Sequence, residues 1–204
     1  MKKPMLLLID TLEDKQVFTS SLIEGTEYRQ CKFISDTDSH RFNECSFKRC
    51  SFDLLDLRNS TFSDCIFEHC DFSNLEFDDS RFYRVNFNNC KFMGSSFYKA
   101  QISDCAYSNC LLDSSSFSIA SLTDVEFSDS NLKNSSFQSI HHKNLSFKSI
   151  IMDSIDFSET DLNKLDFTSC DFDSIRFTPR LIKGLKIRYD QSPLILATLG
   201  LKVE

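Results

Sequence analysis

A five-residue repeat organises this sequence, and it is plainest in residues 60–97, which read STFSDCIFEHCDFSNLEFDDSRFYRVNFNNCKFMGSSF. Phenylalanine stands at every fifth position of this stretch, from Phe62 to Phe97. The same spacing runs without a shift from Phe42 to Ile187, where thirty positions hold nineteen Phe, five Leu, three Ile, one Tyr, one Met and one polar exception, His142. One structural unit therefore repeats through most of the chain.

A period of five fits neither regular secondary structure. Five residues of an α-helix advance a side chain by about 500°, so the large residues would spiral around its surface. In a flat strand an odd period would send them alternately to opposite faces. We therefore predict that the chain turns once per repeat and points each large apolar residue inward.

A smaller residue lies two positions before each large one, and all nine cysteines occupy this slot. The odd number of cysteines and the absence of a CxxC motif argue against a disulfide framework. Reduced thiols that fill the core are the favoured interpretation. The apolar run at Met5–Ile9 is too short for a signal peptide, and no run reaches transmembrane length. We expect a cytoplasmic protein without membrane contact.

The repeat divides the chain into three parts. Residues 1–15 are expected to cap the first coil with a short strand at Met5–Ile9. Residues 16–189 carry the repeat, which is interrupted once, because Phe33 and Phe42 are nine residues apart. The polar residues near 34–41, among them Asp36 and Asp38, form either an irregular corner or a projecting contact loop.

The segment 190–204 has a different pattern, which predicts a helix and a terminal strand. Asp190 or Ser192 can cap the helix, Pro193 suits its first turn and Gly200 its end. We expect the apolar residues of this segment to hold two copies together; they are Leu194, Ile195, Leu196, Leu199, Leu201 and Val203.

Catalytic and metal-binding patterns are absent from the sequence. It contains no phosphate-binding glycine loop, dinucleotide fingerprint, HExxH or GxSxG motif. His141 and His142 have no spaced acidic or cysteine ligands beside them, so a strained or hydrogen-bonded corner is favoured over a metal site. We expect no enzymatic activity, no cofactor and no small-molecule substrate.

The segments Cys70–Asp71–Phe72–Ser73–Asn74 and 170–174 resemble the pentapeptide-repeat family. The resemblance covers most of the chain and implies an all-β fold, a right-handed quadrilateral β-helix in which four repeats make one coil. Stacked coils would form a rod in which each coil contacts only its neighbours.

The end of the chain resembles the C-terminal dimerisation segment of the quinolone-resistance (Qnr-type) members of that family. The similarity covers Gly184–Leu185–Lys186–Ile187, Gln191 and the leucines that follow. Residues 31–33, before the polar loop, resemble the site of the first loop of those proteins. Their second, larger loop is missing here, which keeps the related gyrase-protecting immunity proteins open as an alternative.

Charge is unevenly distributed if each coil has twenty residues. The face through Phe52, Phe72 and Phe92 carries six acidic residues to two lysines, and the face through Leu57, Phe77 and Phe97 carries six to three basic residues. We predict that this acidic side contacts a partner through Asp53, Asp56, Asp71, Glu76, Asp78, Asp79, Asp113, Asp153, Asp156, Glu159, Asp171 and Asp173.

The Qnr resemblance implies that the partner is a type II topoisomerase, either DNA gyrase or topoisomerase IV. A homodimer would bind it as a DNA mimic, without binding nucleic acid itself, and protect it from a quinolone or a natural poison. The alternative is a structural or adaptor rod that binds another protein.

Overall fold

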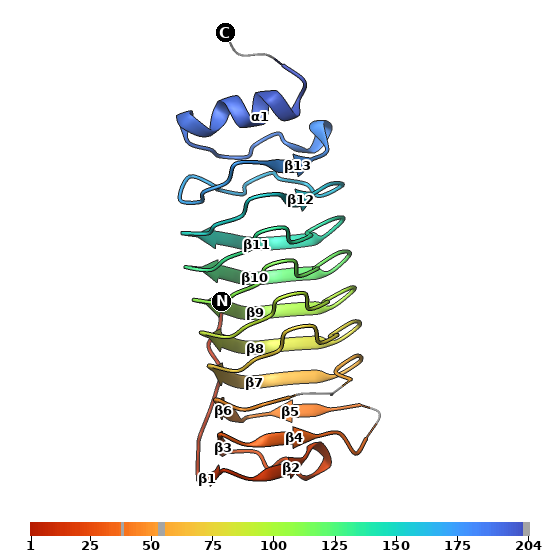
Figure 1. Ribbon diagram of the computed structural model, residues 1–204, viewed down its shortest axis with the longest axis vertical. Helices are drawn as coiled ribbons and strands as arrows, with labels where there is room; N and C mark the ends of the chain where they lie inside the picture. The colour runs from red at the N-terminus through yellow and green to blue at the C-terminus, as the bar shows by residue number, and fades with distance from the viewer. Residues whose placement is uncertain (38, 53–55, 202–204) are drawn as a thin grey trace.

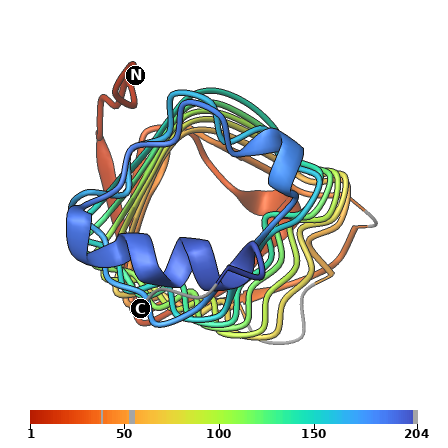
Figure 2. The same ribbon diagram turned by 90° about the horizontal axis from the view of Figure 1, so that it is seen from above.

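The structure is a computed structural model that describes residues 1–37, 39–52 and 56–201. The chain forms a rod of stacked coils that ends in a short helix (Figure 1). Viewed along its axis, the rod is a four-sided, right-handed β-helix with superimposed coils (Figure 2). The predicted fold class is confirmed.

The first coils are smaller than the rest. They contain β1 (Asp10–Glu13), β2 (Gln16–Phe18), β3 (Thr26–Arg29), β4 (Lys32–Ile34), β5 (Arg41–Asn43) and β6 (Ser46–Lys48), with a 3-10 turn at Thr19–Ser21. Asp10 pairs with Thr26, which is sixteen residues away, and Glu27 pairs with Ser46, which is nineteen residues away. The polar loop near 34–41 joins β4 to β5.

Later coils repeat every twenty residues, as Phe62 pairs with Phe82 and Ser121 with His141. Two adjacent faces merge into one parallel sheet of long strands: β7 (Thr61–Glu68), β8 (Arg81–Asn88), β9 (Gln101–Ser108), β10 (Ser121–Ser128) and β11 (His141–Lys148). The other two faces are joined by single bridges, such as Asp71 to Lys91 and Ser96 to Ser116. β12 (Ile155–Phe157) and β13 (Ile175–Phe177) pair on one of these faces.

Each five-residue repeat turns because the second residue after the large apolar one adopts a left-handed backbone. Asp64, Asn74 and Asp79 have φ values of 52°, 60° and 57°, and the same sign recurs through the rod. Asn and Asp tolerate this conformation better than most residues. The single bend per repeat explains how a period of five keeps every large residue inside.

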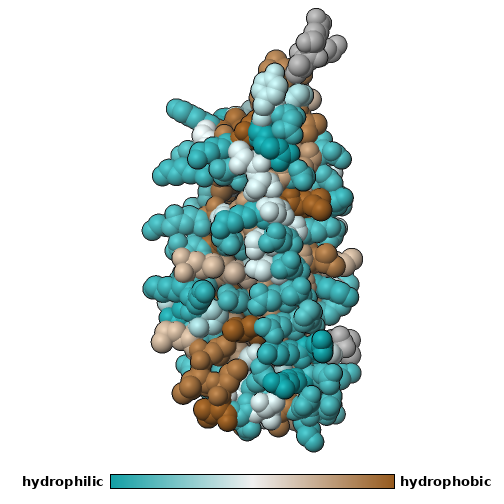
Figure 3. Space-filling view, turned by 90° about the vertical axis from the view of Figure 1, so that its left-hand side faces the viewer, coloured by the Kyte–Doolittle hydropathy of each residue, from teal (hydrophilic) through white to brown (hydrophobic). Residues whose placement is uncertain are grey.

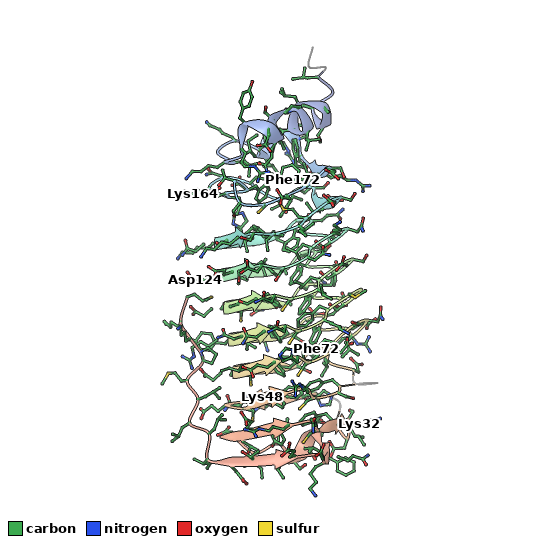
Figure 4. All side chains as sticks on the ribbon, turned by 60° about the vertical axis from the view of Figure 1, so that its left-hand side comes forward. Lys32, Lys48, Phe72, Asp124, Lys164 and Phe172 are labelled. Carbon is green, nitrogen blue, oxygen red and sulfur yellow. The ribbon has the colours of Figure 1, made fainter. Side chains whose placement is uncertain are left out.

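The core is a set of stacked rings along the rod. Phe42, Phe62 and Phe82 lie nearly parallel, with ring centroids 4.7 and 4.6 Å apart. Neighbouring columns meet edge to face, as Phe67 and Phe72 do at 5.4 Å. Both arrangements are favourable for aromatic rings, and Phe72 and Phe172 lie inside the rod in Figure 4.

All nine cysteines are buried and free. Burial raises the pKa of the Cys45 thiol to about 11 and that of Cys105 to about 12. Since the thiolate is the reactive form, burial makes Cys45 and Cys105 unreactive fillers of the core.

Helix α1 (Ser192–Thr198) closes the C-terminal end of the rod, after 3-10 turns at Pro179–Leu181 and Tyr189–Gln191. In Figure 2 it runs along one side of the last coil. The expected side-chain cap is wrong: Gln191 occupies the N-cap position without a capping hydrogen bond, and Asp190 instead binds Arg188. The positive φ of Gly200, 79°, follows the end of the helix, as the sequence predicts.

The expected strand at Met5–Ile9 is also wrong. The first strand is the more polar β1, and residues 1–9 instead run along the outside of the rod, from the level of β9 down to β1 (Figure 1). We call residues 1–9 the N-terminal strap. An apolar run can therefore stay outside the coil, because the first inward side chains come later in the chain.

Replacing Phe87 with Ala is expected to lower the free energy of unfolding by about 3–5 kcal/mol, the usual cost of emptying the site of a buried Phe. Phe87 is 1% exposed and stacks on Phe67 and Tyr107 at 5.1 and 4.9 Å. Urea unfolding followed by circular dichroism measures the effect. Met93→Ala, at a side chain that is 44% exposed, is the control and should cost less than about 0.5 kcal/mol. Equal losses of unfolding free energy in the two variants would contradict a core of stacked aromatic rings.

Candidate partner-binding surface

The predicted acidic residues lie on the two faces that lack long strands. One face follows the column of bridges from Ser51 through Asp71 and Lys91 to Asp171, and the other follows the column from Glu76 through Ser96 to Asp156. Successive coils are hydrogen-bonded, so side chains twenty residues apart become neighbours along the rod. We call these two faces the acidic side.

Most of the predicted contact residues reach solvent. Asp78, Asp113 and Asp153 are half-buried, Asp156 is buried at 9% exposure, and Asp53 lies outside the described residues. The remaining seven are exposed: Asp56, Asp71, Glu76, Asp79, Glu159, Asp171 and Asp173. Asp156 is therefore the member of the set least able to contact a partner.

Many of these carboxylates are paired with bases of the same rod. Seven of them form salt bridges: Asp71 with Lys91 at 3.7 Å, Asp153 with Lys133 at 3.0 Å, Asp156 with Arg176 at 3.7 Å, Asp171 with Arg188 at 3.0 Å, Asp56 and Glu76 with Arg58 at 2.5 and 3.6 Å, and Glu159 with Arg180 at 2.5 Å. Exposed pairs of this kind contribute little to stability, but they reduce the net field of the surface. The acidic side is weaker in charge than the sequence indicates.

Hydrogen bonds and basic neighbours keep Asp56 and Asp156 ionised. The hydrogen bond from Arg58 lowers the pKa of Asp56. Burial alone would raise the pKa of Asp156, but bonds from Ser158 and Gln138 and the charge of Arg176 outweigh it and lower the pKa. These groups carry negative charge at neutral pH.

Asp79, Asp113 and Asp173 form no salt bridge within the described part of the chain. Three apolar side chains are exposed on the face that carries Asp113 and Asp173: Met93 at 44%, Leu111 at 41% and Ile151 at 45%. The acidic side is thus a mixture of free carboxylates and apolar groups, which is typical of a protein contact surface.

The polar loop near 34–41 is tied to the coil beneath it. Asp36 accepts hydrogen bonds from the Thr19 hydroxyl at 3.1 Å and from the Ser20 amide at 3.0 Å, and the bonds from Ser20 and Thr19 lower its pKa. His40 is 2% exposed and packs beside Phe42. Asp38 lies outside the described residues. The side chain of Asp36 therefore positions the loop.

The C-terminal residues divide into an inner and an outer group. Ile195 is 6% exposed, Leu194 and Leu196 are half-buried, and Leu199 and Leu201 are 37% and 54% exposed. Val203 lies outside the described residues. α1 therefore covers the last coil with one side and leaves apolar groups uncovered.

Sequence reasoning missed the role of Gln191, which is 2% exposed. Its amide nitrogen donates to the carbonyl oxygens of Phe167 at 3.2 Å and Cys170 at 2.7 Å, and its amide oxygen accepts from the Arg188 amide at 2.8 Å. Nothing in the sequence indicates that a polar residue just before a helix will hydrogen-bond the backbone of the last coil.

Sequence reasoning also missed the N-terminal strap. Its Met5 amide donates to Asp64 at 2.8 Å, and its Ile9 amide donates to the Gly25 carbonyl at 2.8 Å. Met5, Leu7 and Ile9 are at least 69% exposed. Figure 3 faces this side and shows apolar side chains gathered over the N-terminal coils.

The comparisons with known proteins identify the family. The model of the pentapeptide repeat region matches residues 80–149 and 120–190, and a model of nine pentapeptide repeats matches 42–91. The chain belongs to the pentapeptide-repeat family. No curated protein matches the sequence.

A solved structure shows the same fold, and a second one is a weaker match. A trypsin-treated variant of QnrB1, a plasmid-mediated fluoroquinolone resistance protein, is 20% identical and has a TM-score of 0.56; the match covers 97% of this chain and 98% of that one. HetL, a pentapeptide repeat protein involved in heterocyst differentiation regulation in the cyanobacterium Nostoc sp. strain PCC 7120, is 13% identical and has a TM-score of 0.46, with 90% and 89% covered. At 20% identity the QnrB1 match shows the fold alone.

No helix among the described residues is long and apolar enough to cross a membrane. The described residues also contain no cluster of His, Cys, Asp and Glu side chains that could hold a metal ion.

Asp64→Asn is expected to loosen the strap. Burial alone would raise the pKa of Asp64, but hydrogen bonds from Arg84 and the Met5 amide lower it, so the carboxylate stays ionised until the pH falls below its ordinary range. A neutral amide removes the charge-assisted bond and leaves Arg84 without its salt-bridge partner, so hydrogen exchange at Met5 should accelerate by about tenfold. Asp129→Asn, at an exposed carboxylate, is the control. Unchanged exchange in Asp64→Asn would show that other contacts hold the strap.

Proposed function

We propose that this protein binds a type II topoisomerase, DNA gyrase or topoisomerase IV, through its acidic side and protects it from a quinolone or a natural poison. The proposal rests on one observation. In the described structure, carboxylates without a salt bridge and exposed apolar side chains lie in columns on two adjacent faces of the rod. Full-length similarity in fold to a fluoroquinolone resistance protein supports it. The protein would act in the cytoplasm as a binding protein, without catalysis.

Charge imitation is only one part of the proposed recognition. Duplex DNA carries about one negative charge per 1.7 Å along its axis, whereas much of the acidity here is cancelled by salt bridges. We therefore assign the binding energy to contacts that combine Asp113 and Asp173 with the exposed apolar groups of their face, with Asp79 on the adjacent face. The free carboxylates would mainly set orientation and association rate.

Asp79→Lys with Asp173→Lys is expected to weaken topoisomerase binding at least tenfold and to abolish protection. Both positions accept a basic residue, since Lys99 and Lys133 occupy the same columns in other coils. The melting temperature should hardly change, because the two carboxylates are exposed and form no salt bridge in the described structure. Binding is measured with immobilised rod and purified gyrase or topoisomerase IV, and protection by DNA supercoiling with and without a fluoroquinolone.

The matched control reverses two exposed carboxylates on the other faces, Glu44→Lys with Asp129→Lys. Their columns already hold Arg84 and Arg49, so the substitutions are equally compatible with the fold. Equal loss of binding in control and test variants would reassign the effect to net charge. If wild-type rod binds neither enzyme and leaves supercoiling unchanged, the topoisomerase proposal is wrong and an adaptor role takes its place.

We further propose that two rods join through their C-terminal ends. Leu199 and Leu201 are exposed beside α1, and burying a leucine contributes about 1.5–3 kcal/mol. A twofold axis there would bury the same groups on both copies and present two acidic sides to a twofold-symmetric enzyme.

Leu199→Asp with Leu201→Asp should convert the dimer to a monomer without loss of the β spectrum, since neither side chain fills the core. Light scattering after size-exclusion chromatography gives the mass. Ala197→Asp, at an exposed position within α1, is the control and should remain dimeric. A wild-type protein that is monomeric at micromolar concentration would refute the dimer while leaving the topoisomerase proposal open.

A further inference from the structure

The long-strand sheet stops abruptly at β11. Within the described residues β11 pairs with β10 on one side and with no strand on the other. In lower coils the backbone amide of the first strand residue donates a hydrogen bond to a carbonyl oxygen of the coil beneath. The Ser121 amide donates to the Ala100 carbonyl, and the His141 amide to the Ala120 carbonyl. In the described part of the chain, no backbone hydrogen bond joins 140–148 to 161–168.

The cause lies in the next coil, where the chain turns instead of extending. The Leu165 amide donates to the Leu162 carbonyl at 3.1 Å, which is the tight turn that the coils below form on the two faces without long strands. His142 is in register with Leu122 and lies directly below this turn. Its Nε2 lies 2.5 Å from the Asp161 carbonyl oxygen, so a side chain contacts the next coil where backbone groups would normally do so.

A hollow of about 500 Å³ lies at this break, between residues 140–145 and 161–165. His141, Lys143, Asn144 and Lys164 are exposed around it, and His142 is half-buried. Figure 4 shows Lys164 projecting above β11, on the edge of the rod where Asp124 projects below it. The hollow thus combines an unpaired strand edge with basic side chains.

The charge of the hollow is opposite to that of the molecule. The chain has a formal net charge of −7, whereas two lysines and two histidines border the hollow with one acid, Asp161. None of these side chains forms a salt bridge within the described structure. An unpaired edge favours an added strand, and this lining favours an acidic one.

We propose that the hollow is a docking site for an extended acidic segment of a partner protein. The segment adds as a strand to the free edge of β11 at His141–Leu145, and its backbone pairs with that edge. Its carboxylates face Lys143 and Lys164, and the side chains that alternate with them point away. This site is separate from the acidic side and does not depend on the topoisomerase proposal.

The probe is a short fluorescein-labelled peptide of alternating glutamate and valine, and its binding is followed by fluorescence anisotropy at low salt. Lys143→Glu with Lys164→Glu should weaken binding at least tenfold. The control, Lys99→Glu with Lys183→Glu, makes the same charge change at exposed lysines elsewhere and should have little effect. Circular dichroism establishes that both variants keep the β spectrum.

Two further peptides test backbone pairing on the wild-type protein, independently of any variant. The same sequence with alternate backbone nitrogens methylated cannot form the ladder and should bind at least tenfold more weakly. A lysine and valine peptide should not bind. Hydrogen exchange at 141–145 should slow when the acidic peptide is added.

Equal binding of the methylated and unmethylated acidic peptides would show simple charge attraction and overturn the strand-addition proposal. Undiminished binding by the Lys143 and Lys164 variant would place the peptide elsewhere and overturn it as well. Competition by millimolar inorganic phosphate with no change in exchange at 141–145 would reassign the hollow to small anions.

Discussion

Face-to-face stacking of phenylalanine between coils is the constraint on which the rest of this structure depends. Between Phe42 and Phe137 the stacked rings of a column have centroids 4.6–5.1 Å apart, close to the usual spacing of neighbouring strands. Rings can stack in this way only if each coil returns to the same place after twenty residues. The left-handed residue in each repeat makes that return possible, and the small slot accepts cysteine, serine or alanine.

The outward slots are left free to vary once the core is fixed, and the twenty-residue register gathers them into columns. Chemistry that looks scattered in the sequence becomes a line of side chains on the rod. Asp71, Lys91 and Leu111 are neighbours on one face for this reason. The same register places salt bridges between coils, so a column of acids and bases partly neutralises itself.

The fold could be predicted from the sequence because a strict repeat specifies the same inward contact many times. The acidic side could be predicted in outline, since face assignment follows from the register. Its ion pairs could not be predicted. The salt bridge between Arg188 and Asp171, for example, depends on a turn that does not follow the repeat. The strap was missed because its apolar residues resemble a strand, while its position is set by the remote carboxylates Asp64 and Asp104. The sequence contains one indication of the break above β11, the polar His142 at a position that is otherwise large and apolar. The break itself could not be predicted, because it depends on the turn after Asp161.

The most direct test of the account is a hydrogen-exchange footprint of the rod in complex with purified gyrase or topoisomerase IV. The account predicts slower exchange along the acidic side, at segments around 71–79, 111–113 and 171–173, with little change on the faces of β7–β10. Protection confined to the long-strand faces, or no protection with either enzyme, would contradict it.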